Sequence, residues 1–137
     1  MEKARLPKFV IHDMSTFWFF MDPLSIEADD VQYIVDENPD LTEMGWRCGP
    51  ADEPLEITPE FIQQVRTATA YFATLRRVPA NQSSYGLKHE AERWGKENGL
   101  EPYVCNCAAI IAGLLLGYRP VRAKYRCMYG WFRKPRK

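Results

Sequence analysis

Residues 106–117 of the chain read NCAAIIAGLLLG and contain its longest apolar run, from Cys107 to Leu116. Asn106 is a residue type that caps helix N-termini, and Gly117 is typical of a helix end. The run is too short to cross a membrane, which takes about 20 residues. Its large side chains cover most of the circumference of a helix, and its small ones would let other helices approach closely. We therefore expect a buried central helix around which the other elements pack.

A second helix is predicted further toward the N-terminus. Thr58 is a good N-cap, and Pro59 suits the first helical position. A single apolar stripe follows at spacings of four, three, four and three, formed by Phe61, Val65, Ala68, Phe72 and Leu75. Pro79 cannot continue a helix, so we expect the helix to end before it.

A third helix is predicted between these two, from Ser83 or Ser84 to Asn98–Gly99. Lys88 and Glu92 lie four residues apart, which predicts an ion pair on one helix face. The buried face is expected to hold Leu87, Ala91 and Trp94.

Strands are expected before the helices. Residues 7–21 are rich in β-branched and aromatic types, which predicts one or two short strands broken near Asp13–Ser15. Another strand is predicted over Val31–Val35. Four prolines between residues 36 and 59 exclude long elements there, so this segment is expected to be an ordered loop.

A strand is also predicted in the segment from Arg119 to Lys137, which we call the tail. From Val121 to Phe132, apolar and aromatic residues alternate with a second series that contains Arg122, Lys124 and Arg126. This period of two predicts a strand, or a hairpin bent near Gly130, with a basic face toward solvent. The fold class we infer is α+β, with three central helices packed against short strands from the N-terminal segment and a C-terminal basic strand or hairpin.

Charge is segregated along the chain. Its 137 residues are near the commonest size of one domain, so we expect a single domain with an acidic N-terminal part (1–58) and a helical and basic part (59–137). Residues 1–60 carry 14 acids and 4 bases, net −10, and residues 61–137 carry 4 acids and 14 bases, net +10. Such segregation of charge indicates binding to charged partners more than it indicates a particular fold. The two halves could also neutralise each other, within one chain or head to tail in a homodimer.

The cysteines and histidines lack the paired spacing of zinc ligands, so neither a metal nor another cofactor is expected.

Without the features of a signal peptide or an apolar run of 18 residues, we expect a cytoplasmic protein, no membrane association and free thiols at Cys48, Cys105, Cys107 and Cys127. No nucleophile elbow, phosphate-binding glycine loop or zinc-protease motif occurs, and no catalytic residue is predicted. The enzymatic alternative is a small hydrolase or nuclease that uses His89 as acid or base.

The tail combines cations, which neutralise phosphates, with rings, which stack on unpaired bases. Its candidate residues for binding nucleic acid or a partner are Arg119, Arg122, Lys124, Tyr125, Arg126, Trp131, Arg133 and Lys134. An alternative is a helix-turn-helix-like regulator built on the last two helices. The connection from Asn98 to Cys105 is longer than such a motif uses, and the last helix lacks base-reading side chains. The acidic first third could instead occupy the basic groove of a protein partner.

A resemblance adds a biological setting. The run Ser83-Ser84-Tyr85-Gly86-Leu87-Lys88-His89, followed by Glu92, by Tyr103-Val104-Cys105-Asn106-Cys107 and by Ile110 and Ile111, resembles a pattern of small phage and mobile-element accessory proteins. It covers residues 70–118, with Cys107 where that pattern usually has glycine. The resemblance implies no activity or site residue, but it implies proteins directed at host machinery, such as anti-CRISPR and other counter-defence inhibitors. We therefore expect a non-catalytic accessory protein that binds a host nucleoprotein complex or its nucleic acid and inhibits or redirects it.

Overall fold

The computed structural model describes residues 22–49, 54–75, 78–79, 81–122 and 128–133. In chain order its elements are η1 (Pro23–Ser25), α2 (Ala28–Glu37), β1 (Leu41–Thr42), β2 (Gly45–Trp46), α3 (Pro59–Thr74), α4 (Ser84–Glu97), α5 (Asn106–Leu115), β3 (Arg119–Arg122) and β4 (Gly130–Arg133). β1 pairs with β2 and β3 with β4, both antiparallel. The structure thus combines helices with two small antiparallel sheets, and the predicted α+β class is confirmed.

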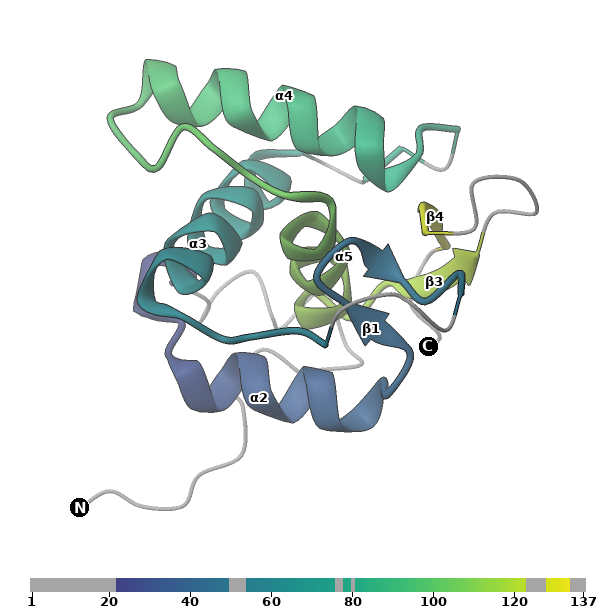
Figure 1. Ribbon diagram of the computed structural model, residues 1–137. Coiled ribbons are helices and arrows are strands. Elements are labelled where there is room, and N and C mark those ends of the chain that lie inside the picture. The colour runs from purple at the N-terminus through teal and green to yellow at the C-terminus, as the bar shows by residue number, and fades with distance from the viewer. Residues whose placement is uncertain (1–21, 50–53, 76–77, 80, 123–127, 134–137) are drawn as a thin grey trace.

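Helix α5 lies at the centre of the molecule. Figure 1 shows α4 above it, α2 below it, α3 on one side and the strands on the other. Nine of its ten residues are buried, which confirms the predicted central helix. A Cβ at Gly113 would collide with the ring of Phe132, so this glycine lets β4 pack directly on α5. The Phe132 ring also meets Phe72 of α3 and Tyr118 edge to face, and these contacts hold the tail against the core.

The caps predicted for α3 and α4 are present. The Thr58 hydroxyl accepts a hydrogen bond from the N–H three residues later at 3.1 Å, and the Ser83 hydroxyl does the same at 3.2 Å. α3 ends at Thr74, several residues before Pro79, and α4 ends at Glu97 beside the predicted Asn98–Gly99 stop.

The N-cap predicted for α5 is wrong by one residue. Cys105 occupies that position, and its Sγ accepts from the N–H of Ala108 at 3.4 Å. Asn106 is the first helical residue, and its buried side chain bonds to three other segments of the chain. Those bonds join segments distant in sequence, so capping propensity alone could not reveal them.

The strand predicted over Val31–Val35 is also wrong, because these residues belong to α2. The Asp30 carboxylate accepts a hydrogen bond from the Glu27 N–H at 2.9 Å and so fixes the start of the helix. Carboxylates in a first helical turn are further favoured by the helix dipole. Val31 and Ile34, three residues apart, form the buried face of α2, and its packing against the core outweighs the strand propensity of this segment.

The tail forms the predicted hairpin, with Gly130 at the start of β4 instead of at the bend. Residues 123–127 and the strands predicted within residues 7–21 lie outside the described residues. In the described part of the segment predicted as a loop over residues 36–59, the structure has the end of α2 at Glu37, the two short strands β1 and β2, and the first residue of α3, Pro59.

Cys48 is disulfide-bonded, so the prediction of a free thiol is wrong for this residue. That prediction rested on the expected compartment, whereas pairing depends on which cysteines the fold brings together. Cys105 and Cys107 are free, as predicted, and Cys127 lies outside the described residues. In the part of the chain that is described, no helix is both long and apolar enough to span a membrane.

Candidate functional site

Four segments that are far apart in the sequence meet at the start of α4. The Ser84 hydroxyl donates to Oδ1 of Asn106 at 2.7 Å and accepts from the N–H of Gly130 at 3.1 Å. Nδ2 of Asn106 donates to the carbonyls of Met44 and Met128, both at 3.0 Å. We call Ser84 and Asn106 the polar hub, because they join α4, α5, the β1–β2 turn and the approach to β4. Both residues therefore have a role in the fold.

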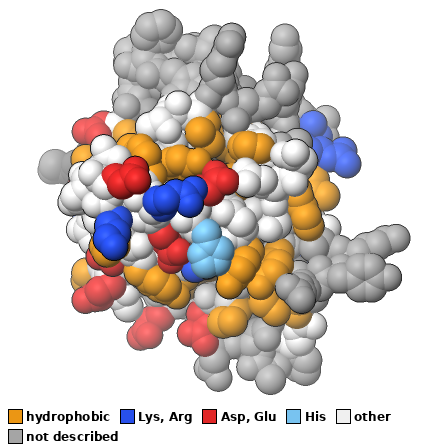
Figure 2. All heavy atoms as spheres, turned by 90° about the horizontal axis from the view of Figure 1, so that it is seen from above, with side chains coloured by type: hydrophobic (Ala, Val, Ile, Leu, Met, Phe, Trp, Pro, Cys, Tyr) orange, Lys and Arg blue, Asp and Glu red, His pale blue; other side chains and the backbone are white. Residues whose placement is uncertain are grey.

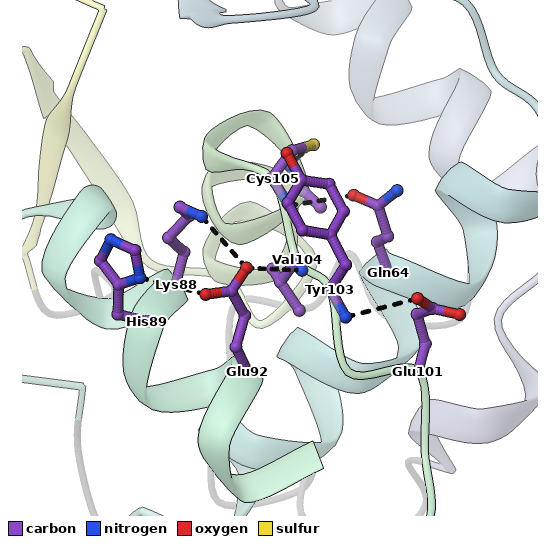
Figure 3. A network of polar contacts seen from close by, with 9 residues as sticks. Gln64, Lys88, His89, Glu92, Glu101, Tyr103, Val104 and Cys105 are labelled. Carbon is purple, nitrogen blue, oxygen red and sulfur yellow. Dashed lines mark hydrogen bonds and ion pairs between the residues drawn. The ribbon is translucent and has the colours of Figure 1, made fainter. Parts of the chain in front are cut away.

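A second network lies one turn further along α4 (Figure 3). One oxygen of Glu92 accepts from the Lys88 ammonium at 3.1 Å and from the N–H of Val104 at 3.1 Å. The other oxygen lies 3.0 Å from Nδ1 of His89. Burial disfavours ionisation of Glu92, but the bond from Val104, the bond and charge of Lys88 and the bond from His89 outweigh it and lower the pKa of this carboxyl. The predicted Lys88–Glu92 pair is confirmed, and the bond from the Val104 N–H to Glu92 ties α4 to the connection that leads into α5.

The Lys88 ammonium also lies against two aromatic rings. It is 5.4 Å from the ring centroid of Tyr85 and 5.2 Å from that of Tyr103. The residue is only 8% exposed, so these ring faces and Glu92 replace most of the water around the cation. Tyr85 in turn stacks on Tyr129, with centroids 4.8 Å apart and planes at 22°. We call the series Tyr129, Tyr85, Lys88 and Tyr103 the Tyr–Lys stack.

The Tyr–Lys stack reaches the surface at Tyr85, which is 40% exposed, and at Tyr103, which is 54% exposed. The His89 ring meets Tyr85 edge to face, with centroids 4.6 Å apart, and it is also exposed. Figure 2 views the molecule from the α4 side and shows hydrophobic and charged side chains gathered around the histidine. This part of the surface therefore combines open rings with a shielded cation.

A further polar group joins α3 to α4. The Tyr71 hydroxyl donates to Glu90 at 2.7 Å, and the Gln82 amide donates to the other oxygen of Glu90 at 2.7 Å. Burial, followed by the bond to Glu90, raises the pKa of Tyr71 to about 12. The bond from Gln82 lowers the pKa of Glu90; burial opposes this shift, and the bond from Tyr71 adds to it. Every polar group in this cluster bonds to another, which identifies it as a clamp between two helices.

The free cysteines are not arranged as activated nucleophiles. Burial raises the pKa of Cys105, although it lies at a helix N-terminus, and burial raises the pKa of Cys107 well above its ordinary value. The N–H of Cys105 donates to the side chain of Gln64 at 2.9 Å, so this residue helps to fix the start of α5. His89, the candidate acid or base, has Glu92 and Tyr85 as its described partners.

Arg122, a candidate binding residue of the tail, contacts the acidic part of the chain. Its guanidinium bonds to the Asp40 carboxylate at 2.9 Å and to the Arg47 carbonyl at 2.5 Å. It also lies 5.4 Å from the ring centroid of Trp46. This residue joins β3 to the β1–β2 hairpin, so here the two oppositely charged halves do meet within one molecule.

The other tail candidates are placed as follows. Arg119 and Arg133 face each other across the β3–β4 pair, with Arg133 exposed and Arg119 partly buried. Trp131 pairs with Val121 and is partly buried. The remaining candidates, Lys124, Tyr125, Arg126 and Lys134, lie outside the described residues.

Tyr85 and Tyr103 are not among the site residues predicted from the sequence. Tyr85 and Lys88 are three residues apart on a helix, and this spacing could have indicated their contact. Tyr103 lies on a connection and Tyr129 precedes β4, so no local spacing relates them to α4.

Helix α5 is enclosed by the core, so it presents no row of side chains that could enter a DNA groove. Among the described residues, no group of three or more histidine, cysteine or acidic side chains is placed to hold a metal ion. Comparison of the chain with protein-family models, with curated protein sequences and with solved structures finds no match in any of the three.

Proposed function

We propose that this protein is a non-catalytic accessory protein of a phage or mobile element, and that it binds the nucleic acid of a host nucleoprotein complex and blocks or redirects that complex. The observation that carries the proposal is the contact between Tyr129 and Tyr85. Tyr85 lies on α4, and Tyr129 belongs to the segment of the chain that holds the most concentrated positive charge.

Charge supports nucleic acid as the ligand. From Arg119 to the end, the sequence holds eight bases and no acid. Arg122 forms an ion pair with Asp40, so we assign the phosphate contacts to the other lysines and arginines of the tail. Each contacted phosphate releases condensed counterions, and this release makes binding weaken steeply as salt rises.

The rings support the same ligand. Tyr129 directly precedes β4 and stacks on Tyr85, and both Tyr85 and Tyr103 lie against the Lys88 ammonium, so a bound strand would pass along these rings. Base stacking on aromatic side chains tolerates any sequence, because every base has a flat face. A combination of cations and open rings is the arrangement used by proteins that bind single strands.

The burial of α5 argues against the regulator alternative, because that helix would have to read the DNA groove. The hydrolase or nuclease alternative is separated from binding by His89→Ala. An enzyme would lose turnover with this change, whereas a binding protein would keep its affinity within a few fold.

The proposal is tested by fluorescence anisotropy with a labelled 15-nucleotide single strand over a range of salt concentrations. We compare the wild type with a tail variant, Lys124→Ala/Arg126→Ala, and with a matched control of equal charge, Arg93→Ala/Lys96→Ala on α4. If both tail cations contact phosphates, the slope of log affinity against log salt should fall by about 1.4 in the tail variant, at about 0.7 per contact. The control should keep the wild-type slope. Absence of binding by the wild type, or equal losses in both variants, would refute the proposal.

A further inference from the structure

The three rings of the Tyr–Lys stack differ in how much of their surface other groups already cover. Tyr85 is surrounded by Tyr129, His89 and Lys88, so other groups already use much of its ring. Tyr103 contacts Lys88 and has no other ring contact in the described part of the chain. It is also the more exposed of the two, at 54% against 40% for Tyr85. The free end of the stack is therefore the ring of Tyr103.

Tyr103 is held in place although it is exposed. Its neighbour Val104 is completely buried, and the Val104 N–H is fixed by Glu92. The N–H of Tyr103 itself donates to the Glu101 carboxylate at 3.3 Å, and Lys88 lies against its ring. Figure 3 shows the ring standing beside this network. A ring fixed in advance loses little conformational entropy when a flat group stacks on it.

We infer that Tyr103 is a stacking site for one unpaired nucleobase and that Lys88 is the residue that positions its ring. This inference rests on the proposed function, and it adds that the preferred ligand is single-stranded. A paired base in a duplex is covered on both faces by its neighbours, so it cannot stack on Tyr103 without being unstacked first. At the other end of the stack, Tyr129 belongs to the basic tail, whose sequence supplies cations for the phosphates of the same strand.

The test uses the full-length chain, a labelled single strand and the duplex of the same sequence, at one fixed salt concentration. We expect Tyr103→Leu to weaken binding of the single strand by about 5- to 150-fold, the range found for loss of one stacked base. Tyr103→Phe keeps the ring and should bind as the wild type does. Leu24→Ala is the control for loss of an exposed apolar side chain, since Leu24 is 49% exposed and lies in η1.

A second readout reports on stacking itself. A strand that carries 2-aminopurine should lose fluorescence when it binds the wild type or Tyr103→Phe, and it should lose much less with Tyr103→Leu. Because Tyr103 is uncharged, its variants should keep the wild-type salt slope. Wild-type affinity and quenching in Tyr103→Leu, or duplex binding as tight as single-strand binding, would overturn the inference while leaving the salt-dependent proposal intact. Failure of the wild type to bind either nucleic acid would refute both.

Discussion

Replacement of Asn106 by alanine should strongly destabilise the protein, because one buried side chain joins three segments. Asn106 is 8% exposed; it accepts from Ser84 at 2.7 Å and donates to the carbonyls of Met44 and Met128 at 3.0 Å each. In the alanine variant, the Met128 carbonyl still accepts a hydrogen bond from the Trp46 N–H, whereas the Met44 carbonyl loses the bond from Asn106. The variant thus removes three hydrogen bonds and leaves part of the hub without partners.

The magnitude follows from these contacts. A buried hydrogen bond contributes about 1 kcal/mol net, so three of them predict a loss of about 3 kcal/mol in the free energy of unfolding. With a urea dependence of about 1.5 kcal/mol per molar, the midpoint of unfolding should fall by about 2 M. The measurement is urea denaturation followed by far-UV circular dichroism.

Asn98→Ala provides the matched control. Asn98 is an exposed asparagine that ends α4, and its side chain donates only to the Trp94 carbonyl of its own helix. We expect it to shift stability by about 0.5 kcal/mol or less. If Asn106→Ala lost less than about 1 kcal/mol, or no more than the control, the polar hub would not hold these segments together.

Three further changes test other parts of the fold. Tyr71→Phe removes only the hydroxyl that donates to Glu90, so the urea titration should show a loss of about 1 kcal/mol. Glu90 and Glu92 both have a lowered pKa in the folded state, so their contribution to stability is complete above the ordinary glutamate pKa of about 4.3 and is lost as pH falls through the folded values. Thermal melts between pH 7 and pH 3 should show this decline, and Glu90→Gln/Glu92→Gln should reduce it; a melting temperature that rises over that acid range would contradict the assignment. Gly113→Ala places a methyl group where the Phe132 ring lies, and we expect a loss of about 1–3 kcal/mol; unchanged stability would mean that β4 does not press against α5.

Local signals in the sequence predicted α3 and α4 closely, because the contacts that start these helices are local. Thr58 and Ser83 cap α3 and α4 through N–H groups three residues away, and the Lys88–Glu92 pair spans one helical turn. α2 was assigned wrongly because strand propensity was weighed without the Glu27–Asp30 contact that starts the helix. That contact also lies within three residues, so the sequence contained a signal for it.

The site was much less predictable, because its members meet only in the folded chain. Tyr103 reaches Lys88 from a connection, and Tyr129 reaches Tyr85 from the tail. Arg122 was expected to bind a partner, yet it contacts Asp40, which is 82 residues away in sequence. Neither periodicity nor composition carries information about contacts at such separations.

Binding of a single strand at Tyr103 is tested by photo-crosslinking of the wild-type protein to a strand that contains one 5-bromouracil, followed by mass spectrometry of the crosslinked peptides. If Tyr103 stacks on an unpaired base, a crosslink should form at Tyr103, disappear with Tyr103→Leu and weaken as salt rises. Crosslinks confined to the acidic part of the chain, or no crosslink at a salt concentration where binding is measured, would contradict it.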